Sequence, residues 1–129
     1  MNASEFVWTF PVYILATNYT MSPATEKVIF DDKIRFITPE AWPGGPCAIA
    51  LFTDAHLAEQ FRDESSPGLD VLPLRTPSAL KEFLERAKGD YLAVVVDLNR
   101  KTRRATPFFV QEAIAEMDRL TSYENDLND

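Results

Sequence analysis

An unbroken run of apolar residues, Leu92–Val96, lies at the centre of the segment Tyr91–Asn99. A run rich in valine with no polar interruption is typical of a strand whose two faces are both buried. A Gly-Asp pair precedes the run and a basic loop follows it. Because helical patterns lie on both sides of it in the sequence, we predict that it is the central strand of a sheet covered by helices.

The first third of the chain carries shorter strand patterns. Apolar residues alternate with period two along Phe6–Ala16, which predicts a strand. Proline cannot donate to a ladder, so Pro11 predicts an edge strand or a bulge. The segments Lys27–Phe30 and Lys33–Thr38 predict two short strands around a tight Asp-Asp hairpin, with a single bent strand as the alternative.

Further along the chain, strand patterns alternate with helical patterns. Cys47–Phe52 and Leu69–Leu74 are short apolar runs between turn residues, which predicts two buried strands. Between them, Thr53 or Asp54 caps a predicted helix over about Ala55–Asp63. The residues of this helix that should face the core are Leu57, Ala58 and Phe61.

Thr-Pro pairs precede three predicted helical segments, because threonine can cap a helix and proline fits its first position. Thr38 begins at most one turn, which ends at a Pro-Gly-Gly-Pro sequence that we interpret as a structural turn. Thr76 begins a helix over Pro77–Lys88. Thr106 begins the last helix, which fades near Ser122. The apolar stripes of these two helices are Leu80, Phe83, Leu84 and Ala87, and Val110, Ala113, Ile114 and Met117 with Leu120 or Thr121.

Together these patterns predict a mixed α/β (α+β) fold with a single mixed sheet. A β-rich N-terminal third precedes the order strand, helix, strand, helix, strand and helix. A chain of 129 residues suits one domain and can bury about two-thirds of its unfolded surface. We predict one globular domain over residues 1–122 and an acidic, flexible tail over residues 123–129.

The net charge of −7 bears on the choice of partner, because an acidic protein is repelled by nucleic acid and by anionic membranes. No stretch approaches the roughly 20 apolar residues of a membrane span. A signal peptide requires basic residues before its apolar segment, but no Lys or Arg precedes Phe6–Ala16. The single cysteine allows no intrachain disulfide, in agreement with a reducing compartment. We predict a cytoplasmic protein whose partner is another protein, without membrane contact and with nucleic acid disfavoured.

Nucleophilic or metal chemistry would depend on the single histidine, His56, and the single cysteine, Cys47. Zinc needs several nitrogen or sulfur ligands, which these two residues alone do not supply. A catalytic thiol needs a nearby base, but the intervening strand would carry His56 towards the opposite end of the sheet. We interpret His56 as a structural histidine, surface or half-buried, and Cys47 as a packed core thiol. The sequence predicts no catalytic residue, no metal and no cofactor.

Asp54, Asp97 and Asn99 follow the ends of predicted strands. If the strands at Cys47–Phe52 and Tyr91–Val96 are parallel neighbours, these side chains gather on one rim of the sheet, where ligands bind in open α/β sheets. The alternative gives each residue a local role, in which Asp54 caps a helix while Asp97 and Asn99 shape a turn. We favour the local roles, because each is sufficient by itself.

The loop Arg100–Ala105 is basic against an acidic background, with four of the 13 Lys and Arg residues inside five positions. The predicted helix start at Pro107 adds free N–H groups that favour anions, so a phosphate or an acidic peptide could bind here. The alternative is a solvated loop that pairs with the chain's own carboxylates. The candidate ligand- or partner-binding residues are Asp97, Asn99, Arg100, Lys101, Arg103 and Arg104.

The element order from Ala48 onward resembles the SseB-type amino-terminal domain family over about residues 47–120. Two short motifs carry the resemblance, LFTD at 51–54 and VDLN at 96–99. Members of that family often show a Phe-Thr pair before an acidic helix start, and a later strand that runs into an Asn-containing turn. This chain differs in having a basic run, and no proline, after Asn99. The resemblance implies a small mixed α/β domain with a non-enzymatic role and no catalytic residues.

Three functional hypotheses follow. The leading one is a non-catalytic protein-binding or adaptor module, because the sequence carries no catalytic or metal signature. The second is an anion-binding regulatory module that uses the basic loop at residues 100–104. The third is a small carboxylate-dependent hydrolase or transferase, which requires Asp54 and Asp97 to face one pocket.

Overall fold

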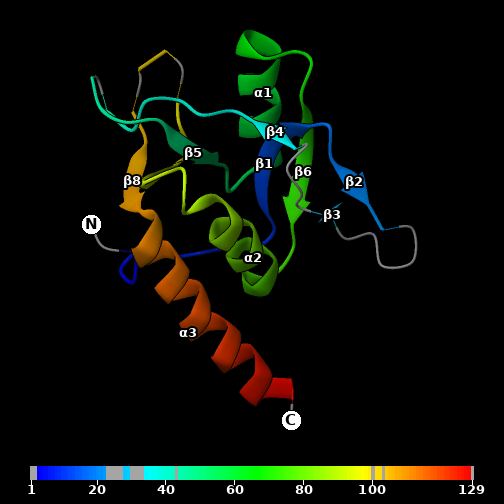
Figure 1. Cartoon of the computed structure of the whole chain (residues 1–129), viewed down its shortest axis with the longest axis vertical. Coiled ribbons are helices and arrows are strands. Elements are labelled where there is room, and N and C mark those ends of the chain that lie inside the picture. The colour runs from blue at the N-terminus through cyan, green and yellow to red at the C-terminus, as the bar shows by residue number, and fades with distance from the viewer. Residues whose placement is uncertain are drawn as a thin grey trace.

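The computed structural model describes residues 3–22, 28–29, 34–42, 44–99, 101–102 and 104–128, with the backbone alone at residues 21, 28 and 123–128. These residues form strands and helices of a mixed α+β fold, which confirms the predicted fold class (Figure 1). The strands are β1 (Val12–Thr17), β2 (Thr20–Met21), β3 (Val28–Ile29), β4 (Arg35–Phe36), β5 (Ala48–Leu51), β6 (Asp70–Leu74), β7 (Ala93–Val96) and β8 (Thr106–Phe109). The helices are α1 (Ala55–Ser65), α2 (Pro77–Ala87) and α3 (Val110–Asn128).

Hydrogen bonding divides the described strands into two three-stranded sheets and a ribbon of β2 and β3. One sheet is antiparallel with the order β4-β1-β6. The other has the order β5-β7-β8, in which β5 and β7 are parallel and β8 is antiparallel to β7. Tyr13 in β1 and Phe52 after β5 exchange two backbone hydrogen bonds, of 2.7 and 2.9 Å, which join the two sheets. β6 and β8 are therefore the outermost strands on the two sides of this joined sheet.

Helices cover both faces of the joined sheet, and alternation along β5 and β7 divides the core between them (Figure 1). We call the face under α2 and α3 the first face, and the face with α1 the second face. The predicted central strand is confirmed, because β7 lies between β5 and β8 and its four residues are buried. On the first face lie Ile49, Leu51, Val94 and Val96. On the second face lie Ala48, Ala50, Ala93 and Val95, with loop residues Ile37, Ala41, Leu98 and Ala105 packed against that cluster.

The N-terminal strand is shorter than the sequence predicted. β1 begins at Val12, directly after the cis Phe10-Pro11 peptide bond. The prediction of an edge strand was wrong, because β1 lies between β4 and β6 and Pro11 precedes the ladder. The aromatic residues before it instead pack in a cluster, with the rings of Phe6 and Phe108 5.4 Å apart. Period-two alternation therefore continued past the true start of the strand into aromatic residues that are half-buried for a different reason, their packing against one another and against Phe108.

Residues 28–42 also depart from the prediction. β3 and β4 both form, but β3 pairs with β2 and β4 pairs with β1, so they do not make a hairpin with each other. The Asp-Asp pair of the predicted hairpin lies outside the described residues. The predicted helical turn after Thr38 is absent, because Glu40 bridges to Cys47 and the Ala41 N–H donates to the Pro46 carbonyl. Gly45 leaves room for the Trp42 side chain, since a Cβ at residue 45 would lie 2.5 Å from the indole nitrogen and the ring would have to move.

The largest correction concerns Thr106. The segment Thr106–Phe109 forms β8, antiparallel to β7, and the last helix begins only at Val110. Pro107 lies opposite Val95 in this ladder. Proline suits a strand position whose N–H would face away from the neighbour, just as it suits the first turn of a helix. The backbone of α3 then continues to Asn128, beyond the end predicted near Ser122.

We expect Val95→Ala to lower the free energy of unfolding by about 2–3 kcal/mol, from lost burial and an unfilled cavity. Val95 is 0% exposed in the middle of the central strand. Lys101→Ala, at an exposed position, should change stability by less than about 0.5 kcal/mol. Chemical denaturation of the two variants makes the comparison, and equal midpoints would contradict the position of β7.

The three Thr-Pro sites should differ in stability effect. Thr76 caps α2, because its hydroxyl accepts a hydrogen bond from the Ala79 N–H at 3.2 Å. Thr76→Ala should therefore destabilise the protein by about 1 kcal/mol. Thr38 and Thr106 begin no helix, so alanine at either site should remove no cap. Thermal melting of the three variants tests this, and a larger loss at Thr38 than at Thr76 would contradict the observed boundaries.

Candidate functional site

The parallel pairing of β5 and β7 brings Thr53 and Asp97 together at the carboxyl ends of the two strands. The Asp97 N–H donates to the Leu51 carbonyl at 2.9 Å. Its carboxylate accepts hydrogen bonds from the Thr53 N–H at 2.7 Å and from the Thr53 hydroxyl at 2.6 Å. Asp97 has a φ of +57°, in the left-handed region, where aspartate is enriched among residues other than glycine. We call this pair of contacts the Thr53–Asp97 link.

Asp54 and Asn99 each fill a local role at the same end of the sheet. Asp54 is the N-cap of α1, and its carboxylate accepts from the N–H groups of His56 and Leu57. The Asn99 side-chain oxygen accepts from the N–H groups of Lys101 and Thr102, at 2.9 and 3.1 Å. The local interpretation of all three polar residues therefore agrees with their hydrogen bonds. Their side-chain oxygens hold the ends of the strands and the start of α1.

A small cleft separates α1 from the segment that follows β7, and we call it the rim cleft. Its volume is about 80 Å³. The predicted residues Asp97, Asn99 and Lys101 contribute to its wall. Arg104 is exposed and does not line it, and Arg100 and Arg103 lie outside the described residues. The residues that line the rim cleft are Leu57, Gln60, Phe61, Glu64, Asp97, Leu98, Asn99 and Lys101.

The sequence did not predict the contribution of α1 to this cleft. Leu57 was assigned to the core, but it is 42% exposed, whereas Ala58 on the same helix is buried. Gln60 and Glu64 are four residues apart and therefore share one side of the helix, 3.4 Å from each other. The spacing of Leu57, Gln60 and Glu64 is a helical stripe that mixes apolar and polar residues. Such a stripe was visible in the sequence, but nothing there showed that it meets the turn after β7.

The basic loop does not lie next to a helix N-terminus in the sequence, contrary to the prediction. We expected a helix N-terminus next to it, but β8 stands between Arg104 and the start of α3 at Val110. The N–H groups of that helix therefore do not add to the positive charge of the loop. Lys101 and Arg104 remain exposed, so the loop still presents positive charge to solvent.

Cys47 and His56 show no sign of a catalytic pair. Cys47 is exposed, which corrects the prediction of a packed core thiol. It lies directly before Ala48, the first buried residue of β5, and therefore outside the part of the chain that is covered on both faces of the sheet. The His56 side chain is 94% exposed, with Nδ1 3.7 Å from a carboxylate oxygen of Glu59. Among the described residues no three His, Cys, Asp or Glu side chains group closely enough to hold a metal ion.

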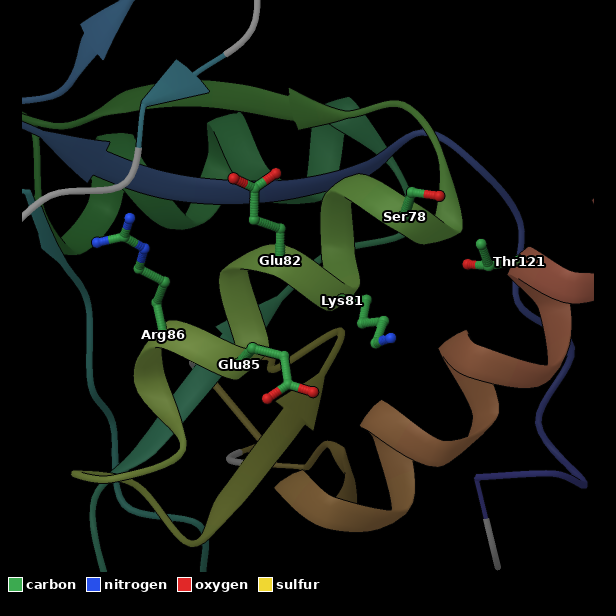
Figure 2. A pocket seen from close by; sticks show the side chains of 6 residues that line it. All are labelled: Ser78, Lys81, Glu82, Glu85, Arg86 and Thr121. Atoms are coloured by element: carbon green, nitrogen blue, oxygen red, sulfur yellow. The ribbon is translucent and has the colours of Figure 1, made fainter.

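A second, wider hollow lies between α2 and α3, with a volume of about 680 Å³ (Figure 2). Its charges do not converge on one point. Lys81 already pairs with Asp118 at 2.5 Å, and this hydrogen bond raises the pKa of the lysine. Figure 2 shows Glu82 and Arg86 directed away from α3, while Lys81 and Thr121 lie between the helices. The hollow is lined by Ser78, Lys81, Glu82, Glu85, Arg86 and Thr121.

No protein-family model matches the chain, and no curated protein matches it. Within the part of the chain that the structure describes, every helix is too short or too polar to cross a membrane.

We expect Thr53→Val to destabilise the protein by about 1–3 kcal/mol, because it removes a hydrogen bond to a carboxylate at nearly constant volume. Thr9→Val serves as the control, since Thr9 is exposed and the same change there should stay within about 0.5 kcal/mol. Urea denaturation measures both. Equal losses at the two sites would show that the Thr53–Asp97 link does not stabilise the rim.

Proposed function

We propose that this chain is a non-catalytic protein-binding module and that the rim cleft receives one apolar side chain of the partner. The size of the cleft carries this proposal. Small-molecule sites typically enclose roughly 300–1,000 Å³. The rim cleft, at about 80 Å³, is nearer to the volume of a single aliphatic side chain than to that of a cofactor or metabolite.

The chemistry of the lining supports the same proposal. Leu57, Phe61 and Leu98 supply apolar groups to the lining. Its polar groups come from Gln60, Glu64, Asp97, Asn99 and Lys101. An apolar centre within a polar rim is the usual anatomy of a protein interface. Binding energy in such interfaces concentrates on a few side chains that fill desolvated pockets. Covering Leu57 would contribute most to binding, because this apolar residue is 42% exposed and would be removed from water.

Charge on the Lys101 side of the cleft favours a partner segment with acidic residues, whereas the α1 side carries Glu64. Lys101 lines the cleft and Arg104 is exposed nearby in the sequence, and both belong to a basic run in a chain of net charge −7. A local basic patch attracts an acidic segment and speeds its association. The partner would then insert one apolar side chain into the cleft and place a carboxylate near Lys101. The resemblance to the SseB-type amino-terminal domain family, which implies a non-enzymatic role, is compatible with this proposal.

The other two hypotheses have weaker support. An anion-binding module would have to rely on the basic loop alone, since α3 begins too late in the sequence to contribute its N-terminus. A carboxylate-dependent hydrolase would need Asp54 and Asp97 to be available. The Asp54 carboxylate accepts hydrogen bonds from the N–H groups of His56 and Leu57, and the Asp97 carboxylate accepts two from Thr53. The protein-binding proposal relies on other side chains of the cleft, chiefly Leu57 and Lys101.

The test compares two exposed leucines. Leu57→Glu places a charge in the rim cleft, whereas Leu92→Glu places one at a position 58% exposed outside it. We expect peptides selected from a displayed library for binding to the native protein to lose affinity at least tenfold for Leu57→Glu, or about 1.4 kcal/mol. They should keep their affinity for Leu92→Glu. Lys101→Glu should slow association and weaken its salt dependence.

Two outcomes would count against the proposal. If the selected peptides bind both leucine variants as well as they bind the native chain, the rim cleft is not the contact. If no peptide is selected but polyphosphate binds in a manner abolished by Lys101→Glu and Arg104→Glu, the anion-binding hypothesis takes its place. Circular dichroism of each variant confirms that the fold is retained.

A further inference from the structure

Each of the two outermost strands contains a proline. β6 carries Pro73 and β8 carries Pro107, and each strand pairs with one neighbour only among the described residues. An outermost strand leaves one row of backbone N–H and C=O groups unpaired, which can add a strand of another chain. The effect of a proline on that row depends on the side to which its missing N–H would point.

In β8, the hydrogen-bond alternation points Pro107 outward. The Val110 N–H donates to the Leu92 carbonyl at 2.9 Å, so the backbone of residue 110 faces β7. Backbone groups alternate between the two sides along a strand, so those of Phe108 also face β7, while those of Pro107 and Phe109 face away. The side chains of these two residues are also exposed on one face of the sheet, that of Phe109 to 50%.

In β6, the same reasoning applies through β1. Tyr13 exchanges both of its backbone hydrogen bonds with Phe52, so its backbone faces away from β6. Pro73 lies directly opposite Tyr13 in the β1–β6 ladder. The two are therefore a pair without mutual hydrogen bonds, and the backbone of Pro73 faces the outer side of β6. Both prolines thus occupy the positions that would otherwise donate to an added strand.

We infer that Pro73 and Pro107 close the two free edges of the sheet to strand addition by a second copy of this chain. In β8 the outward N–H groups would belong to residues 107 and 109, and the proline removes one of these two donors. A carbonyl of an added antiparallel strand would then find no N–H donor at residue 107. The pyrrolidine ring of the proline would also obstruct the approach of that strand. The outer edges of β6 and β8 therefore stay unpaired. A partner would bind through side chains and not through the backbone of these strands.

The test restores the missing donor. We expect Pro107→Val and Pro107→Ala to self-associate at protein concentrations at least tenfold lower than the native chain, as measured by light scattering after size-exclusion chromatography. The two replacements differ in apolar size but share the restored N–H, so a common effect points to the donor. Pro67→Val, in the exposed turn after α1, is the control and should behave as the native chain does. Pro73→Val tests the other edge in the same way.

A second change should reverse the effect. Phe109→Pro, added to the Pro107→Val chain, removes the other outward donor of β8 and should restore the native behaviour. If the Pro107 variants remain as monodisperse as the native chain while folded, the inference is overturned for that edge. Association that persists after Phe109→Pro would also overturn it, because pairing would not run through the backbone of β8.

Hydrogen exchange on the native chain gives an independent measurement, which does not depend on the folding of any variant. The Phe109 amide should exchange quickly because it faces outward, and the Phe108 amide should exchange slowly because it faces β7. The rate at Phe109 should not fall as protein concentration rises. A Phe109 amide as protected as that of Phe108 would show that the edge is already paired.

Discussion

The parallel pairing of β5 and β7 is the constraint on which the rest of the structure depends. The eight residues of these strands are at most 2% exposed, so both faces of the pair have to be covered. The two covers differ, and the side chains differ accordingly. On the first face, α2 and α3 pack over branched residues, whereas on the second face three of the four residues are alanines under loops. Small side chains let irregular backbone approach the sheet beside α1, whose Ala58 belongs to the same buried cluster.

The same pairing fixes the rim of the sheet. It brings Thr53 and Asp97 to the same end, where two hydrogen bonds from Thr53 hold the carboxylate. The direction of the chain after β7 then depends on a residue in the left-handed region, and the turn at Asn99 follows from it. The rim cleft is therefore a consequence of structural contacts. In the interaction proposed above, the residues that would contact the partner are chiefly Leu57 and Lys101.

Proline plays one physical role at several places in this chain. It lacks an N–H, so it is accepted wherever that donor would have no partner within the fold. Pro77 meets this condition at the start of α2, and Pro73 and Pro107 meet it on the outer sides of β6 and β8. This equivalence explains why Thr106-Pro107 looked like a helix start. It also connects that error to the edges of the sheet, since the strand position that accepts Pro107 is the one that faces solvent.

The sequence by itself determined the elements whose signals are local. The buried run of β7, the stripe and cap of α2, and the start of α1 follow from residues near one another in the chain, although the sequence left Thr53 and Asp54 as alternative caps of α1. Tertiary structure alone decided which strands β3 and β4 pair with and whether Thr106–Phe109 is strand or helix. It also decided whether Leu57 faces the core or the solvent. A strand gains its hydrogen bonds only from a distant partner, and a half-exposed helical residue is core or surface according to what lies against it. For this reason the rim cleft, made by α1 and the turn after β7, could be predicted from the sequence only on its β7 side.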